Sequence, residues 1–447
     1  MKNDLQSYLS AKKSVNGGYP DVLAAVQAYM SNTYENLLSA EMNQADTKLV
    51  KEYIKQYLVT HKIVVDNFTE EELCDKLFSD MAEYSFLTKL LRNAEKMHLE
   101  EIDINSYEDI DLIVAGRKYK SPETFLSPQH SVDIIRRMLQ ASGAVIDDGK
   151  PTALGSLAKN IRITVLKTPI LDDDIGIAAS IRVVQKTTLS KSTLAQDTAT
   201  MSMLDFLTQA VRYGISICVA GNTGSGKTST ASWLMSTLPD NKRIYTIEEG
   251  SREFDLVRRG KDGKVCNSVI HTVTKSSLDK SAEITQENLL DFALRFNPDI
   301  ICVGEMRSRE AFAAQEAART GHTVITTIHS KTAAGAYMRM TTLAKRAYEF
   351  SDDTLMKMMV EAFPIIIFQR QLEDHTRKMT EIIEGEDYYN GRLVYRTLFR
   401  YIVDDNEGIQ NGNRVVKGHF ERGEFISDKL RNELIQNGAP KKIANLF

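Results

Sequence analysis

A glycine-rich segment has the residue types and spacing with the clearest chemistry in this chain. Residues 221–228 read Gly-Asn-Thr-Gly-Ser-Gly-Lys-Thr, a full match to the pattern G-x-x-x-x-G-K-[ST]. Glycines let backbone N–H groups turn inward around phosphate oxygens, and a helix that follows adds its positive N-terminal dipole. We therefore expect a nucleoside triphosphate here, with Lys227 on its β- and γ-phosphates and the Thr228 hydroxyl on Mg²⁺. The expected phosphate-binding residues are Gly221, Thr223, Gly224, Ser225, Gly226, Lys227, Thr228 and Ser229.

Carboxylates follow two other segments that have the pattern of buried strands. The apolar run 300–304 leads into Glu305, which has the form of a Walker B element, where a carboxylate supports Mg²⁺ beside the phosphates. Because glutamate is longer than the usual aspartate, we expect it to hold the metal through water. The run 244–247 leads into Glu248 and Glu249, and one of these is expected to orient or deprotonate the water that attacks the γ-phosphate. A pair that only solvates a strand end is the alternative.

Two histidines flank another predicted strand, 323–328. His322 precedes the strand and His329 follows it. A single histidine is more often a structural residue than a catalytic one. We expect one of these histidines to face the nucleotide only if the end of the strand that carries it faces the nucleotide.

The elements that must position these residues alternate between helix and strand from Met201 onward. The predicted helices are 204–213, 228–237, 286–296 and 310–319, and the predicted strands are 215–220, 243–247, 299–303 and 323–328. Such alternation is typical of a mostly parallel sheet covered by helices, an α/β fold. Ligands of these folds bind at the carboxyl ends of the strands, where the acidic residues and His329 lie.

The chain upstream of this domain predicts three further segments. Residues 1–99 show helical spacing of apolar residues, as in Val22, Val26 and Met30, and Thr69 is a plausible cap for a helix that begins at Glu70. Residues 100–186 predict a smaller α+β domain, and the Ser/Thr-rich residues 187–200 predict a linker. Residues 201–447 then form the nucleotide-binding domain with a C-terminal extension.

Composition excludes several classes of protein. The 447 residues have a net charge of −4, which gives no overall electrostatic reason to expect nucleic-acid binding. The four cysteines are widely spaced, which argues against a zinc site and against a disulfide framework. No stretch approaches the roughly 20 apolar residues that span a bilayer, and the first residues show no signal-peptide core. We expect a cytoplasmic protein that reaches a membrane only through a partner.

Four segments together resemble a known family. The 221–228 loop, Thr246–Glu249 with the later Glu253, residues 294–307 and residues 320–329 are similar to the Walker A, Asp, Walker B and His boxes of the type II/type IV secretion and pilus-assembly ATPases, in their usual order. The resemblance covers roughly residues 100 to 400. Three parts of the chain look most like the Tad pilus (CpaF-like) branch: the helical N-terminal region, the segments at Arg162 and 180–182 before the linker, and residues 418–427.

The resemblance implies a homo-hexameric ring of subunits. In each, a small N-terminal domain is joined by a flexible linker to a RecA-like P-loop motor domain, and ATP with Mg²⁺ lies between the two domains. By this resemblance Lys227 and Thr228 bind phosphate and metal, Glu248 is the catalytic carboxylate, Glu305 supports the metal, and His329 senses the γ-phosphate.

The resemblance also implies a role for two arginines, and the sequence differs from the family pattern in two places. Arg182 and Arg243 are implied to stabilise phosphate charge across a domain or subunit interface, as an arginine finger does. Glu249 stands where the family usually has aspartate. The four-cysteine zinc element of type II secretion ATPases is missing, which disfavours that branch.

The sequence therefore predicts an ATPase that drives pilus assembly or protein secretion through an inner-membrane platform protein. A conjugative type IV secretion ATPase is the alternative within the family. A RecA-like nucleic-acid motor and a nucleotide-gated scaffold with negligible turnover are alternatives from other classes. The sequence leaves the transported substrate and the function of residues 1–99 open.

Overall fold

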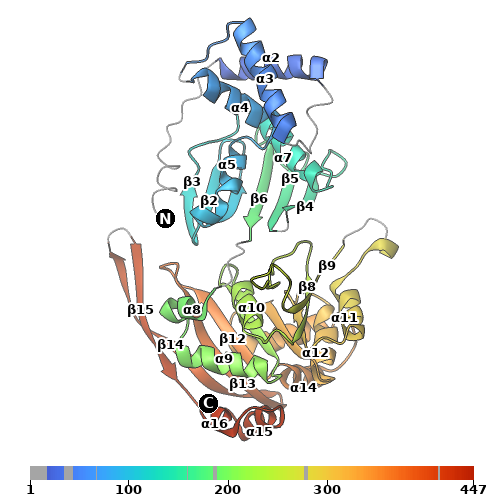
Figure 1. Cartoon of the computed structure of the whole chain (residues 1–447). Coiled ribbons are helices and arrows are strands. Elements are labelled where there is room, and N and C mark those ends of the chain that lie inside the picture. Colours follow the sequence, from blue (N-terminus) through green and yellow to red (C-terminus); the bar gives the residue numbers. More distant parts are fainter. Residues whose placement is uncertain are drawn as a thin grey trace. The chain divides into compact units, whose positions relative to one another are not determined.

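The chain divides into two units, Met1–Gln185 and Lys186–Phe447 (Figure 1). The computed structural model describes residues 18–34, 44–66, 68–158, 160–184, 189–275, 280–410 and 413–447. The predicted helical region thus begins, within the described residues, at residue 18. Among these residues no helix is both long enough and apolar enough to cross a bilayer.

The first part of unit 1 is helical. Its helices are α2 (Tyr19–Tyr34), α3 (Gln44–Thr60) and α4 (Glu70–Ala82). They bury one side-chain cluster that includes Val26, Met30 and Ile54. Thr69 caps α4 as expected: its hydroxyl accepts the backbone N–H of Glu72 at 3.3 Å, and the Glu72 carboxylate accepts the backbone N–H of Thr69 at 2.9 Å.

The second part of unit 1 is a six-stranded antiparallel sheet in the order β3-β2-β1-β6-β5-β4. The helices α5 (Phe86–Arg92), α6 (Ala94–Met97) and α7 (Pro128–Ala141) share one buried core with it. The strands are β1 (Leu99–Ile104), β2 (Ile110–Val114), β3 (Arg117–Lys120), β4 (Thr152–Ala158), β5 (Ile161–Lys167) and β6 (Ile177–Val183).

Unit 2 is built on a nine-stranded sheet in the order β15-β14-β13-β12-β7-β11-β10-β8-β9. Strands β12, β7, β11, β10, β8 and β9 are parallel, and β13, β14 and β15 add to them antiparallel. The parallel strands are β7 (Ile217–Gly221), β8 (Arg243–Glu248), β9 (Ser268–Val273), β10 (Ile300–Val303), β11 (Thr323–His329) and β12 (Ile365–Gln371). The antiparallel ones are β13 (Arg377–Tyr389), β14 (Arg392–Gln410) and β15 (Asn413–Arg422). The predicted α/β fold class is confirmed.

Helices cover both faces of this sheet. One buried cluster contains residues of α9, α10, α15 and α16, and the other contains residues of α11 to α14. The helices are α9 (Met201–Arg212), α10 (Lys227–Ser236), α11 (Gln286–Arg295), α12 (Glu310–Arg319), α13 (Ala333–Ala344), α14 (Asp352–Ala362), α15 (Asp428–Gln436) and α16 (Lys441–Ala444). The central strands β7 and β10 are apolar and buried along their whole length, as expected for strands that are covered on both faces.

Two features of unit 2 differ from a plain linker and motor domain. Helix α8 (Lys191–Asp197) lies inside the segment that was expected to be a linker; the Ser190 hydroxyl caps it, and Leu194 is buried. Residues 187 and 188 of that segment lie outside the described residues. Strand β14 pairs with β13 only up to Arg400, so β14 and β15 continue as a two-stranded hairpin (Figure 1).

Candidate functional site

Four neighbouring parallel strands bring the candidate residues to one edge of the unit 2 sheet. In sheet order β7 leads into the glycine-rich loop, β11 ends at His329, β10 leads to Glu305, and β8 ends at Glu248. Gly221 and His329 are direct partners in the parallel register of β7 and β11. These residues are far apart in the sequence, but the strand order of the sheet makes them neighbours.

The glycine-rich loop has the backbone of a phosphate cradle. Gly226 adopts a left-handed φ of 91°, and α10 begins at the next residue. A Cβ at Gly221 would collide with the Gln369 carbonyl and would lie 2.7 Å from the Ser225 hydroxyl oxygen. The buried Ser225 hydroxyl donates to the Asn222 carbonyl at 2.8 Å and closes the loop. The glycines are therefore needed for close packing as well as for the turn.

The Lys227 ammonium lies inside this loop. Lys227 is buried, and its Nζ donates to the Asn222 carbonyl at 2.9 Å and lies 3.5 Å from Nδ1 of His329. An ammonium has no acceptor, so Nδ1 must accept and the proton of a neutral His329 ring must be on Nε2. That Nε2 lies 3.2 Å from Oε1 of Glu305. His329 therefore connects the loop lysine to the Glu305 carboxylate.

Arg307 extends this set of contacts to a second carboxylate. Its Nη2 lies 2.8 Å from Oε2 of Glu305, and its Nη1 lies 2.7 Å from Oε2 of Glu249. Burial acts to raise the pKa of Glu305, but the hydrogen bond and charge of Arg307, with the charges of His329 and Lys227, lower it below its usual value. The site thus holds Glu305 ionised, as an oxygen ligand for a metal requires.

Glu248 lies in surroundings that do not fit the expected catalytic role. Its side chain is 2% exposed. Oε2 accepts the backbone N–H groups of Glu253 and of Phe254, the latter at 2.8 Å, and Oε1 accepts the Thr246 hydroxyl at 3.0 Å. A carboxylate that accepts hydrogen bonds from these three donors holds the loop after β8 in place. It does not face solvent. Glu249 is 48% exposed and belongs to the contacts of Arg307.

The two predicted arginines belong to different units of the chain. Arg243 begins β8, at the edge of the sheet opposite the loop, and its Nη1 donates to the Phe296 carbonyl at 2.7 Å. Arg182 is an exposed residue of β6 in unit 1. The predicted role of Arg243 is a contact across a domain or subunit interface, and no observation tests it. A role for either arginine across a subunit interface stays a prediction.

Sequence reasoning did not assign a role to Arg307. It lies inside the Walker B segment, two residues after Glu305, and a cation at that spacing from a strand-ending carboxylate is the signal that was available. Its second partner, Glu249, is 58 residues away in the chain. That contact depends on the pairing of β8 with β10.

The loop and its neighbours fit a nucleotide phosphate and its Mg²⁺. Among the described residues no cluster of His, Cys, Asp and Glu forms a complete metal cage. Mg²⁺ that is bound to phosphates keeps several waters and takes only one or two protein oxygens. Thr228, half-buried on the first turn of α10, and Glu305 supply a hydroxyl and a carboxylate. When bound, the metal would neutralise phosphate charge.

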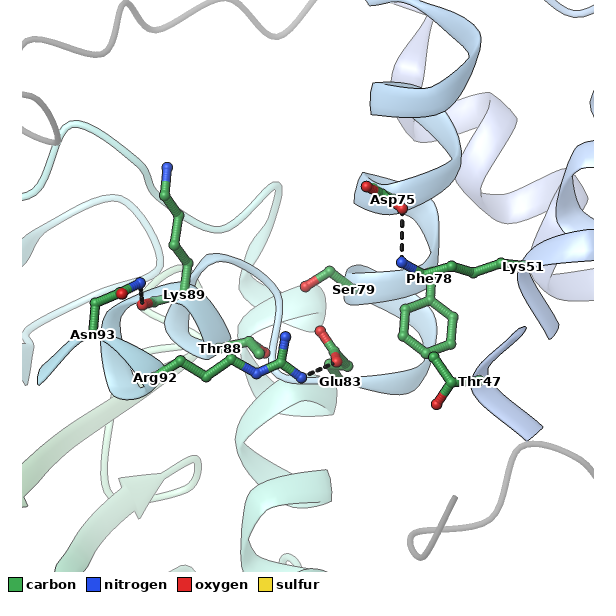
Figure 2. Close-up of a pocket in the computed structure, with 10 residues that line it drawn as sticks. All are labelled: Thr47, Lys51, Asp75, Phe78, Ser79, Glu83, Thr88, Lys89, Arg92 and Asn93. Atoms are coloured by element: carbon green, nitrogen blue, oxygen red, sulfur yellow. Dashed lines mark hydrogen bonds and ion pairs between the residues drawn. The ribbon is translucent and has the colours of Figure 1, made fainter. Parts of the chain in front are cut away.

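Unit 1 has a cavity of its own, of about 540 Å³, between α3, α4 and α5 (Figure 2). Two ion pairs lie in its lining: Lys51 with Asp75 at 2.7 Å, and Arg92 with Glu83 at 2.5 Å. In both pairs the acidic partner offsets the cation. This cavity therefore differs from the cationic, amide-lined loop of unit 2.

Comparison with known proteins identifies a family over most of the chain. The model of the family described as "Type II/IV secretion system protein" matches residues 90–406. The type IV secretion system protein VirB11 of Bartonella quintana is 34% identical over 193 residues, which are 42% of this chain and 51% of that protein. The type II secretion system protein E of Aeromonas hydrophila is 24% identical over 344 residues, 74% of this chain and 64% of that protein.

Solved structures of similar proteins include the ATPase DotB of Legionella pneumophila. It is 20% identical, the match covers 80% of this chain and 85% of that chain, and the TM-score is 0.48. The chain spans about half the length of the first curated relatives that it matches.

Proposed function

The chain belongs to the type II/IV secretion system protein family, and on that premise we propose that it hydrolyses ATP, with Mg²⁺, to drive protein secretion or pilus assembly. The observation that supports this most is the series of contacts Lys227–His329–Glu305–Arg307–Glu249, which runs across four adjacent strand ends. The glycine-rich loop alone would be enough for a site that only bound a nucleotide. Two carboxylates and a histidine beside it provide for hydrolysis.

Four members of this series, all except Arg307, have a proposed role. The loop amides and Lys227 bind the phosphates, and Thr228 and Glu305 hold Mg²⁺, Glu305 through water. Glu249 replaces Glu248 as the carboxylate that orients or deprotonates the attacking water, because it is exposed at the site while Glu248 is buried and hydrogen-bonded. His329 transmits the state of the phosphate to Glu305, since its ring contacts both Lys227 and that carboxylate.

The proposed assembly is a cytoplasmic homo-hexamer that works on a membrane platform protein. Its support is the family, together with the two units of the chain. In a ring, Arg182 of unit 1 and Arg243 at the far edge of the sheet would meet the nucleotide of a neighbouring subunit. The platform would supply the membrane attachment, and direct nucleic-acid binding is not part of the proposal.

Phosphate release by the purified full chain tests this function. We expect Mg²⁺-dependent phosphate release from ATP, and a fall to background in Lys227→Ala, because the loop then loses its cation. Lys261→Ala is the matched control: it removes the same charge from an exposed residue of the loop between β8 and β9, and should leave the rate unchanged. No phosphate release by the folded chain, alone or with platform-containing membranes, would overturn the proposal.

Two alternatives are distinguished by further measurements on the purified chain. The 34% identity to the type IV secretion system protein VirB11 favours a type IV secretion motor. A conjugative motor would be distinguished by the platform or coupling partner that co-purifies. A nucleic-acid motor would show strong stimulation by single-stranded DNA with steep salt dependence. Unchanged turnover with such DNA supports the secretion motor.

A further inference from the structure

The end of β12 and the start of β13 lie beside the glycine-rich loop. Nε of Arg377, the first residue of β13, donates to the Gly224 carbonyl at 2.8 Å across 153 residues of sequence. A Cβ at Gly226 would lie 3.5 Å from Cδ of Arg377, and one at Gly224 would lie 3.3 Å from Oε1 of Gln371. These two strand ends therefore line one side of the loop.

A buried polar atom lies on β12 near these strand ends. Gln369 of β12 is 1% exposed, and within the described part of the chain its Oε1 has no hydrogen-bond partner. Its Nε2 lies 4.0 Å from the position of a Cβ at Gly226. Buried polar atoms of proteins nearly always have a partner, so an unsatisfied one beside a ligand cradle points to a bound molecule or an ordered water.

The turn that delivers Arg377 is held by several hydrogen bonds. The carboxylate of Asp374 accepts the backbone N–H and the hydroxyl of Thr376, at 3.0 and 2.7 Å, and the backbone N–H of Val416 on β15 at 3.3 Å. Leu372 and Thr376 pair through a backbone hydrogen bond of 2.8 Å. Arg377 is thus placed by a fixed turn that is also bound to the β14–β15 hairpin.

We propose that Arg377 is a nucleotide-binding residue whose guanidinium neutralises phosphate charge from within the nucleotide's own subunit. The inference rests on the proposed function. Arginine has N–H donors in a planar fork, so one can hold the Gly224 carbonyl while the delocalised positive charge stays at the loop that cradles phosphate. Arg377 reaches this loop within unit 2 itself, through its contact with the Gly224 carbonyl.

Equilibrium titration with a fluorescent ATP analogue tests the proposal, and energy transfer from Trp233 reads it out. Trp233 is the one tryptophan of the chain, on the helix that follows the loop. We expect Arg377→Ala to weaken binding about tenfold, roughly the effect of one charge-assisted contact. Arg377→Lys, which keeps the charge, should recover binding to within about threefold of wild type. Arg392→Ala, an exposed arginine at the far end of the β13–β14 hairpin, should bind like wild type.

The outcomes separate this inference from the proposed function. Failure of wild type to bind the analogue would count against the proposed function. A Kd for Arg377→Ala within about twofold of wild type, with wild type binding, would overturn the role of Arg377 alone. Arg377→Lys binding as weakly as Arg377→Ala would also overturn it, because only the geometry at Gly224 would then matter. If Arg377→Ala loses its folded circular-dichroism spectrum, Arg377→Gln takes its place with the same thresholds.

Discussion

His329 Nε2 lies 3.2 Å from Oε1 of Glu305, while the other ring nitrogen lies 3.5 Å from the ammonium of Lys227. One imidazole therefore contacts both the residue that would bind phosphate and the carboxylate that would support the metal. A change at the phosphate that moved Lys227 would change the hydrogen bonding of Glu305. We therefore propose that the ring transmits the state of the nucleotide to Glu305.

The first prediction concerns this connection. His329→Ala should lower kcat by about tenfold or more, because Glu305 loses a hydrogen bond to an ionised group worth about 1.5–3 kcal/mol. Nucleotide affinity should stay within about threefold, because the loop and Lys227 remain. Steady-state phosphate release and nucleotide titration measure the two effects. His322→Ala, just before the opposite end of the same strand, is the control and should keep its kcat. Equal loss of affinity and kcat in His329→Ala would contradict the coupling role.

The second prediction separates stability from catalysis at Glu248. Glu248→Gln should lower the free energy of unfolding of unit 2 by about 1–3 kcal/mol, because a neutral amide replaces the ionised carboxylate that accepts the buried N–H groups of Glu253 and Phe254. Urea unfolding followed by Trp233 fluorescence measures this, since that tryptophan is buried in the core of unit 2. Unchanged stability combined with abolished phosphate release would restore Glu248 as the catalytic carboxylate.

The third prediction concerns the pH dependence of stability through Glu305. Its pKa is lowered in the folded chain, chiefly by Arg307 acting against burial. A depressed pKa contributes stability above the unfolded value of 4.5 and loses it as the pH falls through the folded value. The difference in unfolding free energy between wild type and Glu305→Gln should therefore be constant above about pH 5.5 and shrink below pH 4.5.

Unfolding by urea at each pH, again read by Trp233, measures that difference. Glu349→Gln is the control, because Glu349 is exposed in the connection between α13 and α14. Its difference from wild type should stay near zero at every pH. A difference for Glu305→Gln that grew as the solution became more acidic would have the wrong sign and would contradict the arrangement around Arg307.

The parts of the site that could be predicted from sequence are those set by local patterns. The 221–228 loop needs only glycine spacing and a flanking strand and helix, and the eight predicted helices and strands from 204 to 328 match α9, β7, α10, β8, α11, β10, α12 and β11 to within a few residues. Adjacent parallel strands then bring Glu305 and His329 to the loop. Periodicity and the chain order of elements are sufficient for this level of detail.

The rest depends on contacts between distant residues. Glu248 and Glu249 are adjacent and chemically alike, and only the path of the loop after β8 turns one carboxylate onto backbone N–H groups and the other toward Arg307. Arg377 reaches Gly224 because β12 pairs with β7 and β13 returns antiparallel. In the expected linker, Ser190 caps α8 and Leu194 is buried, although the Ser/Thr-rich composition favours a loop.

Single-turnover phosphate release by Glu249→Gln tests the central claim most directly. The claim is that the exposed carboxylate held by Arg307 acts on the attacking water beside a loop that binds ATP. We predict that Glu249→Gln binds the fluorescent ATP analogue like wild type and releases phosphate at least about 100-fold more slowly, the usual contribution of a positioned base. Release by Glu249→Gln at the wild-type rate would contradict the account.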